Sequence, residues 1–239
     1  MTHPIEDMIE PRSIDDFAFS TTRDYQLLKG ILDGKLPFPL GGKNGFCFWG
    51  AYGTGKTTLA KLMPVLLEAK GVMRPARQNA HFDARYKTYE FNRCGVSAGD
   101  ADTLTAIETR CNEVHCQPTD SGWNYEILDE VDLMQARTQA ALKSIMTSAT
   151  ATVFLLTTNH IVKLDDGIKD RCHLIEMNAP TSAQIVELSC RVLRQLGLTE
   201  VEIQRTNLAS IAASCRGSWR ELIPVLVLEH ALQVATRTP

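Results

Sequence analysis

The sequence is short of several features that would assign a chain to a special class. It has seven cysteines but no Cys-x-x-Cys pair, and an odd number is untypical of a disulfide framework. No apolar run approaches the length of a membrane-spanning helix. The start of the chain is acidic, with Glu6, Asp7 and Glu10, and lacks the apolar stretch of a signal peptide. Internal repeats and low-complexity tracts are also missing. We therefore expect reduced thiols and a soluble, cytoplasmic protein.

Net charge is almost absent as well. The formal charge of −3 gives the chain no positive field that would attract nucleic acid, so any such contact needs a local patch. Arg74, Arg77 and Arg85 form one candidate patch, although a solvated loop is the default interpretation. Hydrophobic residues make up 44% of the chain, which is enough for a proper core. The length of 239 residues suits one large domain, or a medium domain with a small second one.

The strongest motif is the stretch Gly50-Ala-Tyr-Gly-Thr-Gly-Lys-Thr-Thr58, which fits the P-loop pattern. Its glycines let the backbone bend so that successive N–H groups make an anion nest, and the following helix adds the positive end of its dipole. Lys56 can reach the β- and γ-phosphates of ATP, and the Thr57 hydroxyl can ligate Mg²⁺. The candidate nucleotide-binding residues of this loop are Gly50, Gly53, Thr54, Gly55, Lys56, Thr57 and Thr58.

Strands and helices alternate along most of the chain. Short apolar runs predict five strands, at 46–49, 86–92, 123–128, 152–157 and 173–177. Apolar residues at helical spacing predict helices from 22 to 32, from Thr57 onward with a kink at Pro64, from 101 to 114 and from 133 to 146. Strands that alternate with helices favour an α/β fold with a parallel sheet and right-handed crossovers.

The pattern changes to helices alone after Ala179-Pro180. Three further helices are predicted, at 182–196, 208–214 and 219–234. We therefore expect three parts: a flexible lead-in over 1–10, a P-loop ATPase domain over 11–179 and a small all-helical lid domain over 180–239.

A second polar group follows the third predicted strand, in Glu126-Ile-Leu-Asp-Glu-Val-Asp132. Ligands of open α/β sheets bind beyond the carboxyl ends of the strands. A P-loop also needs a carboxylate for Mg²⁺ and a residue that orients the attacking water. We assign Asp129 to the metal and Glu130 to the water as general base. The alternative is that Asp129, Glu130 and Asp132 form a solvated acidic turn.

These motifs, in this order, resemble the boxes of the AAA+ ATPases. The clamp-loader group is the most similar: replication factor C small subunits and their bacteriophage and bacterial relatives. The resemblance runs from about Pro11 to Val234. The other stretches that carry it are Pro11-Arg12 in reversed order, Thr88–Asn92, Gln139–Lys143, Leu156-Thr-Thr-Asn159, Asp170-Arg-Cys172 and Gly217-Ser-Trp-Arg220. Asp170-Arg-Cys172 differs from the usual Ser-Arg-Cys in its first residue and keeps the arginine.

The resemblance implies an AAA+ module with a five-stranded parallel sheet, followed by a helical lid, and it implies roles for further residues. Asn159 would be sensor 1, which hydrogen-bonds the water or the γ-phosphate. Arg171 would be an arginine finger that acts in trans on a neighbour's ATP, and Arg220 would be sensor 2 in its own subunit. Pro11 and Arg12 would lie against the adenine. For each polar residue the alternative is an ordinary turn or surface position.

Two more groups of residues have competing interpretations. Gln139 and Lys143 would relay the state of DNA or of a neighbour to the metal-binding strand, and a solvated helix face is an equal alternative. The bacterial relatives carry a zinc module with tight Cys-x-x-Cys spacing, and we do not expect zinc here because that spacing is missing. The residues that could in principle bind zinc are Cys94, Cys111, His115 and Cys116.

The first hypothesis for function is an ATP-hydrolysing clamp-loader subunit in DNA replication. It would bind ATP and Mg²⁺ between the subunits of a nucleotide-dependent homo- or hetero-oligomer, a ring or spiral, with DNA and a sliding clamp as possible partners and no membrane. Clamp-loader subunits continue into a helical collar, whereas this sequence ends at Pro239, so we expect no collar. Two alternatives stay open: a helicase-loader or transposition-type AAA+ regulator, and a nucleotide-switched binding module. A cellular and a viral host are both compatible with this hypothesis.

Overall fold

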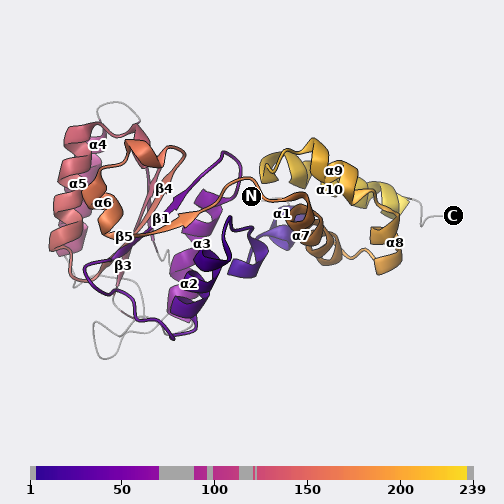
Figure 1. Ribbon diagram of the computed structural model, residues 1–239, viewed down its shortest axis with the longest axis horizontal. Helices are drawn as coiled ribbons and strands as arrows, with labels where there is room; N and C mark the ends of the chain where they lie inside the picture. Colours follow the sequence, from indigo (N-terminus) through magenta and orange to yellow (C-terminus); the bar gives the residue numbers. More distant parts are fainter. Residues whose placement is uncertain (1–3, 70–88, 96–98, 113–120, 122, 236–239) are drawn as a thin grey trace. The chain divides into compact units, whose positions relative to one another are not determined.

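The computed structural model describes residues 4–69, 89–95, 99–112, 121 and 123–235 (Figure 1). The chain folds into two compact units. The sheet unit comprises Thr21–Gly50 and Lys56–Glu176. The helical unit comprises Met1–Ser20, Ala51–Gly55 and Met177–Pro239. The domain boundaries expected from the sequence, after residues 10 and 179, stay predictions.

The sheet unit is built on five parallel strands in the order β2-β3-β4-β1-β5. The strands are β1 (Gly45–Trp49), β2 (Glu90–Arg93), β3 (Asn124–Asp129), β4 (Thr152–Thr158) and β5 (Cys172–Glu176). Every residue of β3 and β4 is buried, as expected for parallel strands covered on both faces. The predicted α/β fold with a five-stranded parallel sheet is confirmed.

Helices cover both faces of this sheet. Helices α4, α5 and α6 lie on one face, and α2 and α3 lie on the other (Figure 1). The bounds are α2 (Thr22–Leu32), α3 (Lys56–Ala69), α4 (Gly99–Asn112), α5 (Ala136–Ser148) and α6 (Asp166–Asp170), with short 3-10 turns η3 (Val131–Leu133) and η4 (Ile161–Lys163). Helix α3 continues through Pro64 to Ala69, and the kink expected there stays a prediction.

Two predicted element boundaries need correction. The helix expected from 133 begins at Ala136, because Glu130 has a left-handed backbone and the turn η3 comes between them. The second strand, expected from 86 to 92, is formed by Glu90–Arg93, and residues 86–88 lie outside the described ranges. Within the described ranges, no helix has both the length and the hydrophobicity needed to cross a bilayer.

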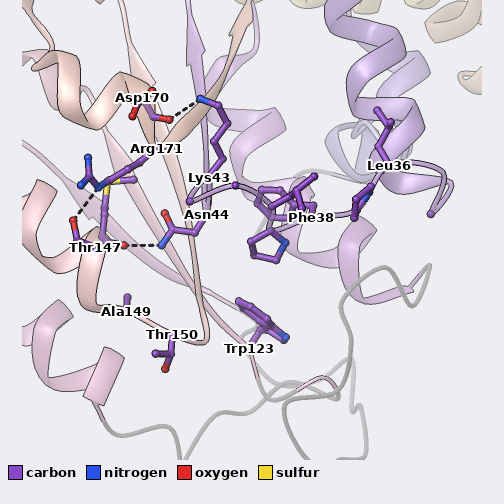
Figure 2. A pocket seen from close by; sticks show the side chains of 17 residues that line it. Leu36, Phe38, Lys43, Asn44, Trp123, Thr147, Ala149, Thr150, Asp170 and Arg171 are labelled. Atoms are coloured by element: carbon purple, nitrogen blue, oxygen red, sulfur yellow. Dashed lines mark hydrogen bonds between the residues drawn. The ribbon is translucent and has the colours of Figure 1, made fainter.

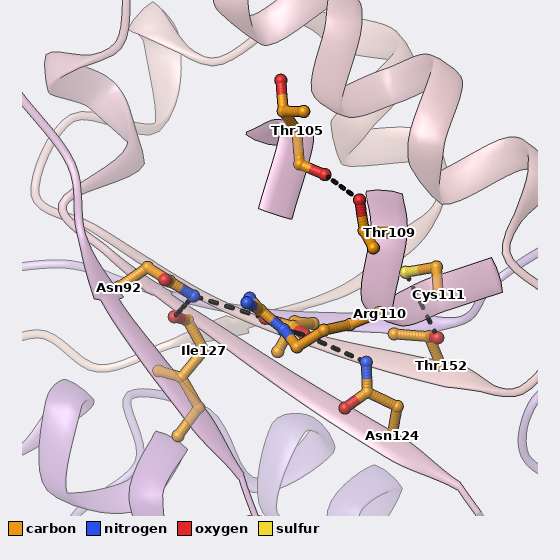
Figure 3. Close-up of polar contacts among 9 residues, drawn as sticks. Asn92, Thr105, Thr109, Arg110, Cys111, Asn124, Ile127 and Thr152 are labelled. Carbon is orange, nitrogen blue, oxygen red and sulfur yellow. Dashed lines mark hydrogen bonds and ion pairs between the residues drawn. The ribbon is translucent and has the colours of Figure 1, made fainter. Parts of the chain in front are cut away.

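A buried ion pair fixes α4 to the sheet (Figure 3). The Glu126 side chain on β3 is fully buried, and its two carboxylate oxygens accept hydrogen bonds from Arg110 Nε and Nη2 at 2.7 and 2.8 Å. The side-chain amides of Asn124 and Asn92 donate to the same carboxylate at 2.9 and 3.3 Å. Because a buried carboxylate is costly unless it is paired and hydrogen-bonded, this network holds α4 in one position over β2 and β3.

The helical unit has its own hydrophobic core. Its helices are α1 (Pro4–Ile9), α7 (Ser182–Gln195), α8 (Glu200–Arg205), α9 (Leu208–Ser214) and α10 (Trp219–Ala235), with the 3-10 turn η1 (Ile14–Asp16). The helices α7, α9 and α10 confirm the three that the sequence predicts, but α1 and α8 are not predicted. Both are six residues long, too short to display helical periodicity. Ile5 and Ile9 of α1 pack against the core of this unit.

Candidate nucleotide-binding site

The sheet order brings three separate sequence motifs to one edge. Strands β3, β4 and β1 are consecutive neighbours, and all of them run in the same direction. Their carboxyl ends lead into the acidic group, into Asn159 and into the P-loop. Since ligands of open α/β sheets bind at the carboxyl ends of the strands, this edge of the sheet unit is the candidate site.

The Asp129 carboxylate joins two of these motifs. Its Oδ1 atom accepts hydrogen bonds from Thr57 Oγ1 of α3 and from Thr157 Oγ1 of β4, each at 2.7 Å. Asp129 is buried, and its Oδ2 atom lies 3.9 Å from Nε of the largely exposed Arg93. The Thr57 hydroxyl and the Asp129 carboxylate thus stand side by side, and oxygen donors of this kind are the ligands that Mg²⁺ prefers. The residues present fit a magnesium ion.

Asp132 forms a second set of bonds at this edge. Its Oδ1 atom accepts from Thr158 Oγ1 at 2.7 Å and from the backbone N–H of Asn159 at 3.3 Å. The first bond ties the turn after β3 to the end of β4, and the second positions Asn159. Because Asp129 and Asp132 are 3% and 8% exposed, the alternative of a solvated acidic turn is wrong for both.

Glu130 occupies a strained backbone position between these two aspartates. Its φ and ψ are 62° and 47°, in the left-handed region, which costs a non-glycine residue about 1–2 kcal/mol. The Glu130 N–H donates to Thr157 Oγ1 at 3.0 Å, so this hydroxyl supports both the strained residue and Asp129. Strained backbone positions of this kind occur more often at functional sites than elsewhere. The left-handed backbone of Glu130 is therefore compatible with its predicted role.

Lys56 folds back on the start of the P-loop. It is the first residue of α3 and is buried, and its Nζ donates to the Gly50 carbonyl at 3.1 Å. The Gly50 N–H in turn donates to the Thr158 carbonyl at 3.3 Å, which connects the loop to β4. A buried ammonium group beside a backbone carbonyl is well placed to exchange that partner for phosphate oxygens. Thr58, two residues further along α3, is exposed.

The middle of the P-loop contacts the start of α10 within the helical unit. The Trp219 N–H donates to the Gly53 carbonyl at 2.9 Å. A Cβ on Gly53, whose φ is +74°, would lie 2.5 Å from Ser218 Oγ, so this approach requires glycine. Thr54 is buried and donates to the carbonyl three residues before it at 2.9 Å. The predicted sensor 2 residue, Arg220, is exposed in the first turn of α10.

The predicted adenine-side residues lie in the same unit. Arg12 is exposed, Pro11 is half-buried, and the Arg12 N–H donates to the Asp16 carboxylate at 2.9 Å. The following Phe17 is buried, and a Cβ on Gly55 would lie 3.3 Å from its ring. The segment after Arg12 therefore packs against Gly55 of the P-loop, and the contact of Pro11 and Arg12 with the adenine stays a prediction.

Arg171 lies at the opposite edge of the sheet. Its carbonyl accepts the N–H groups of Asn44 and Gly45, each at 3.1 Å, so it is level with the first residue of β1. The P-loop follows the last residue of β1, roughly 16 Å away for five residues at the usual strand rise. Arg171 lines a separate cavity of about 840 Å³ together with Lys43 and Trp123 (Figure 2). The structure therefore does not bring Arg171 to Asp129 and Lys56 of the same sheet unit.

The two residues of the predicted relay connect α5 to the segment before α6. Gln139 is buried; its Nε2 donates to the carbonyls of Met134 and Lys163 at 3.1 and 3.2 Å, and its Oε1 accepts from the Asp165 N–H at 2.7 Å. Lys143 forms an ion pair with Asp165 at 3.3 Å. A solvated helix face is therefore wrong for Gln139, and the relay stays a prediction.

The zinc candidates are only partly described. Cys94 and Cys111 are buried in the core of the sheet unit, and burial raises the pKa of both thiols, which disfavours the thiolate that binds metal. His115 and Cys116 lie outside the described residues, as do Arg74, Arg77 and Arg85. In the described part of the chain, His, Cys, Asp and Glu form no cluster of three or more that could hold a metal ion.

Thr157 and Thr158 are site residues that the sequence analysis missed. Both are buried at the end of β4, and their hydroxyls bond the two aspartates. A signal was available, because buried hydroxyls must find partners, and two consecutive threonines at the end of an apolar strand bring one hydroxyl to each face.

A parallel sheet with this strand order, a P-loop after β1, an aspartate–glutamate pair after β3 and a following helical unit define a AAA+ P-loop fold. A solved structure of an arginine-to-alanine variant of RuvB from Thermotoga maritima has this fold. It matches 91% of this chain and 64% of its own chain with a TM-score of 0.62, at 16% sequence identity. That likeness shows the fold alone.

The sequence comparison is more specific. The chain is 26% identical over 231 residues to the replication factor C small subunit of Methanosphaera stadtmanae, and 27% identical over 231 residues to that of Staphylothermus marinus. The protein of the same name from Methanoculleus marisnigri is 26% identical over 195 residues. The alignments cover 95%, 95% and 80% of this chain but 63%, 61% and 53% of the relatives. No model of a protein family matches. The predicted resemblance to the clamp-loader group of AAA+ ATPases is confirmed.

Proposed function

We propose that this chain binds ATP with Mg²⁺ at the P-loop and hydrolyses the bond between the β- and γ-phosphates, which releases phosphate. The observation that carries the proposal is the pair of 2.7 Å hydrogen bonds by which Thr57 and Thr157 hold the buried Asp129 carboxylate. They place a P-loop hydroxyl and a carboxylate together at the edge of the sheet where ligands bind. The buried Lys56 beside the Gly50 carbonyl adds the cation that such a site needs.

Each residue of the site has a separate task. Lys56 binds phosphate oxygens, and Thr57 and Asp129 would hold Mg²⁺, which neutralises phosphate charge when it is bound. Glu130 orients the attacking water and receives its proton. Asn159, held by Asp132 through its backbone, hydrogen-bonds the water or the γ-phosphate.

Further contacts to the nucleotide come from three arginines and a proline. Arg220 at the start of α10 contacts the phosphates in its own subunit, and Pro11 and Arg12 lie against the adenine. Arg171 serves the ATP of a neighbouring subunit. Its place at the edge of the sheet opposite Lys56 supports action in trans, because the length of β1 is greater than the reach of an arginine side chain.

As to the client, we propose a subunit of a clamp loader in DNA replication. The support is the similarity to three proteins named replication factor C small subunit. The chain spans between 53% and 63% of the length of those relatives, so assembly into an oligomer and contacts with DNA and a sliding clamp are part of the proposal.

The test is steady-state ATP hydrolysis with and without primed DNA and a sliding clamp. We expect turnover that DNA and clamp together stimulate, and we expect Lys56→Ala to abolish ATP binding. Lys61→Ala, on the same helix and exposed, is the matched control and should retain activity. Stimulation by duplex DNA without a clamp would favour a helicase-loader or transposition-type regulator, and tight ATP binding without turnover would favour a nucleotide-switched binding module.

A further inference from the structure

The Arg171 guanidinium is held in one orientation by two acceptors from different helices. Its Nε donates to Thr147 Oγ1 at 2.9 Å, and its Nη1 donates to the Gly167 carbonyl at 2.7 Å. Figure 2 shows the bond to Thr147 at the wall of the 840 Å³ cavity. An arginine side chain that is free in solvent samples many rotamers, so two bonds to its planar fork greatly reduce the orientations available.

Thr147 is set up to accept rather than to donate at this contact. Its own hydroxyl donates a hydrogen bond to the Lys143 carbonyl, one turn earlier in α5, at 2.8 Å. With the proton committed to the helix backbone, the lone pairs of the oxygen face outward to the Arg171 Nε–H. A serine can reproduce this arrangement, whereas a valine of the same shape cannot.

The second acceptor of Arg171, the Gly167 carbonyl, is also connected to α5. The ion pair of Lys143 with Asp165, at 3.3 Å, joins α5 to the residue that caps α6, and the Asp165 carboxylate also accepts the Gly167 N–H at 2.8 Å. A Cβ on Gly167 would lie too close to Lys143 Cδ, so the lysine side chain passes directly over this turn and a larger residue at 167 would make it shift. The two acceptors of Arg171 therefore belong to one connected α5–α6 pair.

The rest of the guanidinium keeps its capacity to bind an anion. No carboxylate among the described residues forms an ion pair with Arg171, and its bonds to Thr147 and Gly167 both go to uncharged oxygens. Among the described residues, the Nη2 group therefore keeps its donors, and no carboxylate compensates the positive charge. Because a guanidinium group binds phosphate through N–H donors of fixed geometry, the orientation set by Thr147 decides where these donors point.

We propose that Thr147 is a positioning residue that presents Arg171 to the phosphates of a neighbour's ATP. This inference rests on the proposed function of Arg171 as a trans-acting finger. Thr147 itself touches no nucleotide and acts only through Arg171. Fixing the N–H donors of Arg171 before the reaction avoids reorganisation when charge moves in the transition state. Removing the Thr147 hydroxyl should therefore lower kcat and leave KM unchanged.

The kinetic experiment compares Thr147→Val, Thr147→Ser and Thr150→Val in the full chain with its activating partners. Thr150 is exposed and lines the same cavity, so Thr150→Val is the matched control. We expect Thr147→Val to lower kcat about tenfold with little change in KM, since small displacements of catalytic groups cost factors of about ten to a hundred. Thr147→Ser and Thr150→Val should stay near the wild type.

Thr147→Val made in an Arg171→Ala background distinguishes two explanations for a lower kcat: a misplaced Arg171 side chain and a less stable fold. If Thr147 acts through Arg171, Thr147→Val should cause no further loss there. If Thr147→Val lowered kcat in the Arg171→Ala background as much as it does in the wild type, the proposal would be overturned. It would also be overturned if Thr147→Ser lowered kcat as much as Thr147→Val. An unchanged kcat in Arg171→Ala itself would overturn the trans finger and this inference together.

A second readout does not depend on turnover. Hydrogen exchange of the Arg171 Nε–H, followed by NMR, should be slow in the wild type and in Thr147→Ser, and about tenfold faster in Thr147→Val, because a hydrogen bond protects the donor from water. Equal exchange in all three proteins would overturn the positioning role while leaving the proposed function intact. Protection lost in Thr147→Val with a normal kcat would overturn the catalytic purpose of the contact.

Discussion

The two edges of the parallel sheet hold different sets of charged groups: Asp129 and Asp132 beside Lys56 at the carboxyl edge, and Lys43 and Arg171 at the amino edge. At the carboxyl edge, Asp129 and Asp132 are buried and are bonded by the hydroxyls of threonines. At the amino edge, Lys43 Nζ donates to the carbonyls of residues 170 and 172 at 2.6 and 2.9 Å, and Arg171 bonds to a hydroxyl and a carbonyl. Among the described residues, the hydrogen bonds of Lys43 and Arg171 all go to uncharged oxygens, which leave the positive charge of both side chains in place.

Under the proposed function, this difference would let one chain contribute to two ATP sites. An edge that binds metal and phosphate would be complementary to an edge whose arginine forms no ion pair among the described residues. Such surfaces meet when copies associate head to tail, the arrangement that makes rings or spirals. On this interpretation the carboxyl edge binds ATP and the amino edge completes the site of the next subunit.

The largest expected effect is at the amino edge. Arg171→Ala should lower turnover by about 10³-fold, a typical value for an arginine finger, and should leave ATP affinity nearly unchanged because the finger acts on charge that develops in the transition state. Turnover and nucleotide titration on the same protein measure both quantities. Arg205→Ala, an exposed arginine of α8, is the control. A large loss of ATP affinity in Arg171→Ala would mean that the Arg171 side chain already binds ATP before the reaction, in the ground state.

A smaller loss is expected from the base at the carboxyl edge. Glu130→Gln should bind ATP normally and lose turnover by about 10²-fold or more, the range for general-base catalysis, whereas Lys56→Ala should fail to bind. Binding is measured with a fluorescent ATP analogue and turnover by phosphate release. If Glu130→Gln hydrolyses ATP within a few-fold of the wild type, another group activates the water.

Next in size is the effect of removing the hydroxyl that supports this edge. Thr157→Val leaves the Glu130 N–H without its partner and takes one donor from Asp129, which should destabilise the fold by about 1–3 kcal/mol. The thermal midpoint should fall by several degrees, and Thr157→Ser should restore it. A midpoint equal to that of the wild type in Thr157→Val would show that these bonds are replaced by water.

The smallest effect concerns His173 at the amino edge. Burial against Phe38 and Phe46, followed by the charge of Lys43, lowers the pKa of His173. The folded state thus prefers the neutral ring, and protonation favours the unfolded chain. Stability should fall as the pH drops through about 6.5, the ordinary histidine pKa, and His173→Leu should lose less stability over that range. An equal acid sensitivity of the two proteins would assign the effect to other groups.

Much of the fold can be predicted from the sequence because its signals are local. The P-loop glycines, the apolar strands and the helices predicted at 208–214 and 219–234 are recognisable from neighbouring residues alone. The turn after β3 is harder to predict, since Glu130 takes a left-handed backbone that no propensity favours. The later start of α5 is a consequence of that turn.

The contacts of the site are less predictable because they join distant residues. Hydrophobic periodicity reveals which face of a strand is buried, but not that β4 lies between β1 and β3. That order is what brings Thr157 to Asp129. Arg171 is separated from the P-loop for another reason: it precedes β5, whereas the P-loop follows the neighbouring parallel strand β1. The roles of Asn159, Arg171 and Arg220 stay predictions.

The most direct test of completion in trans mixes two inactive variants. Lys56→Ala lacks the ATP site but keeps Arg171, and Arg171→Ala keeps the ATP site but lacks the finger. In an equimolar random assembly about one head-to-tail interface in four should combine the intact halves, so we predict recovery of about a quarter of the wild-type activity under activating conditions. Light scattering on the same samples verifies that the variants assemble together. Co-assembly without any recovered hydrolysis, at every mixing ratio, would contradict the claim that each ATP site is completed by the neighbouring subunit.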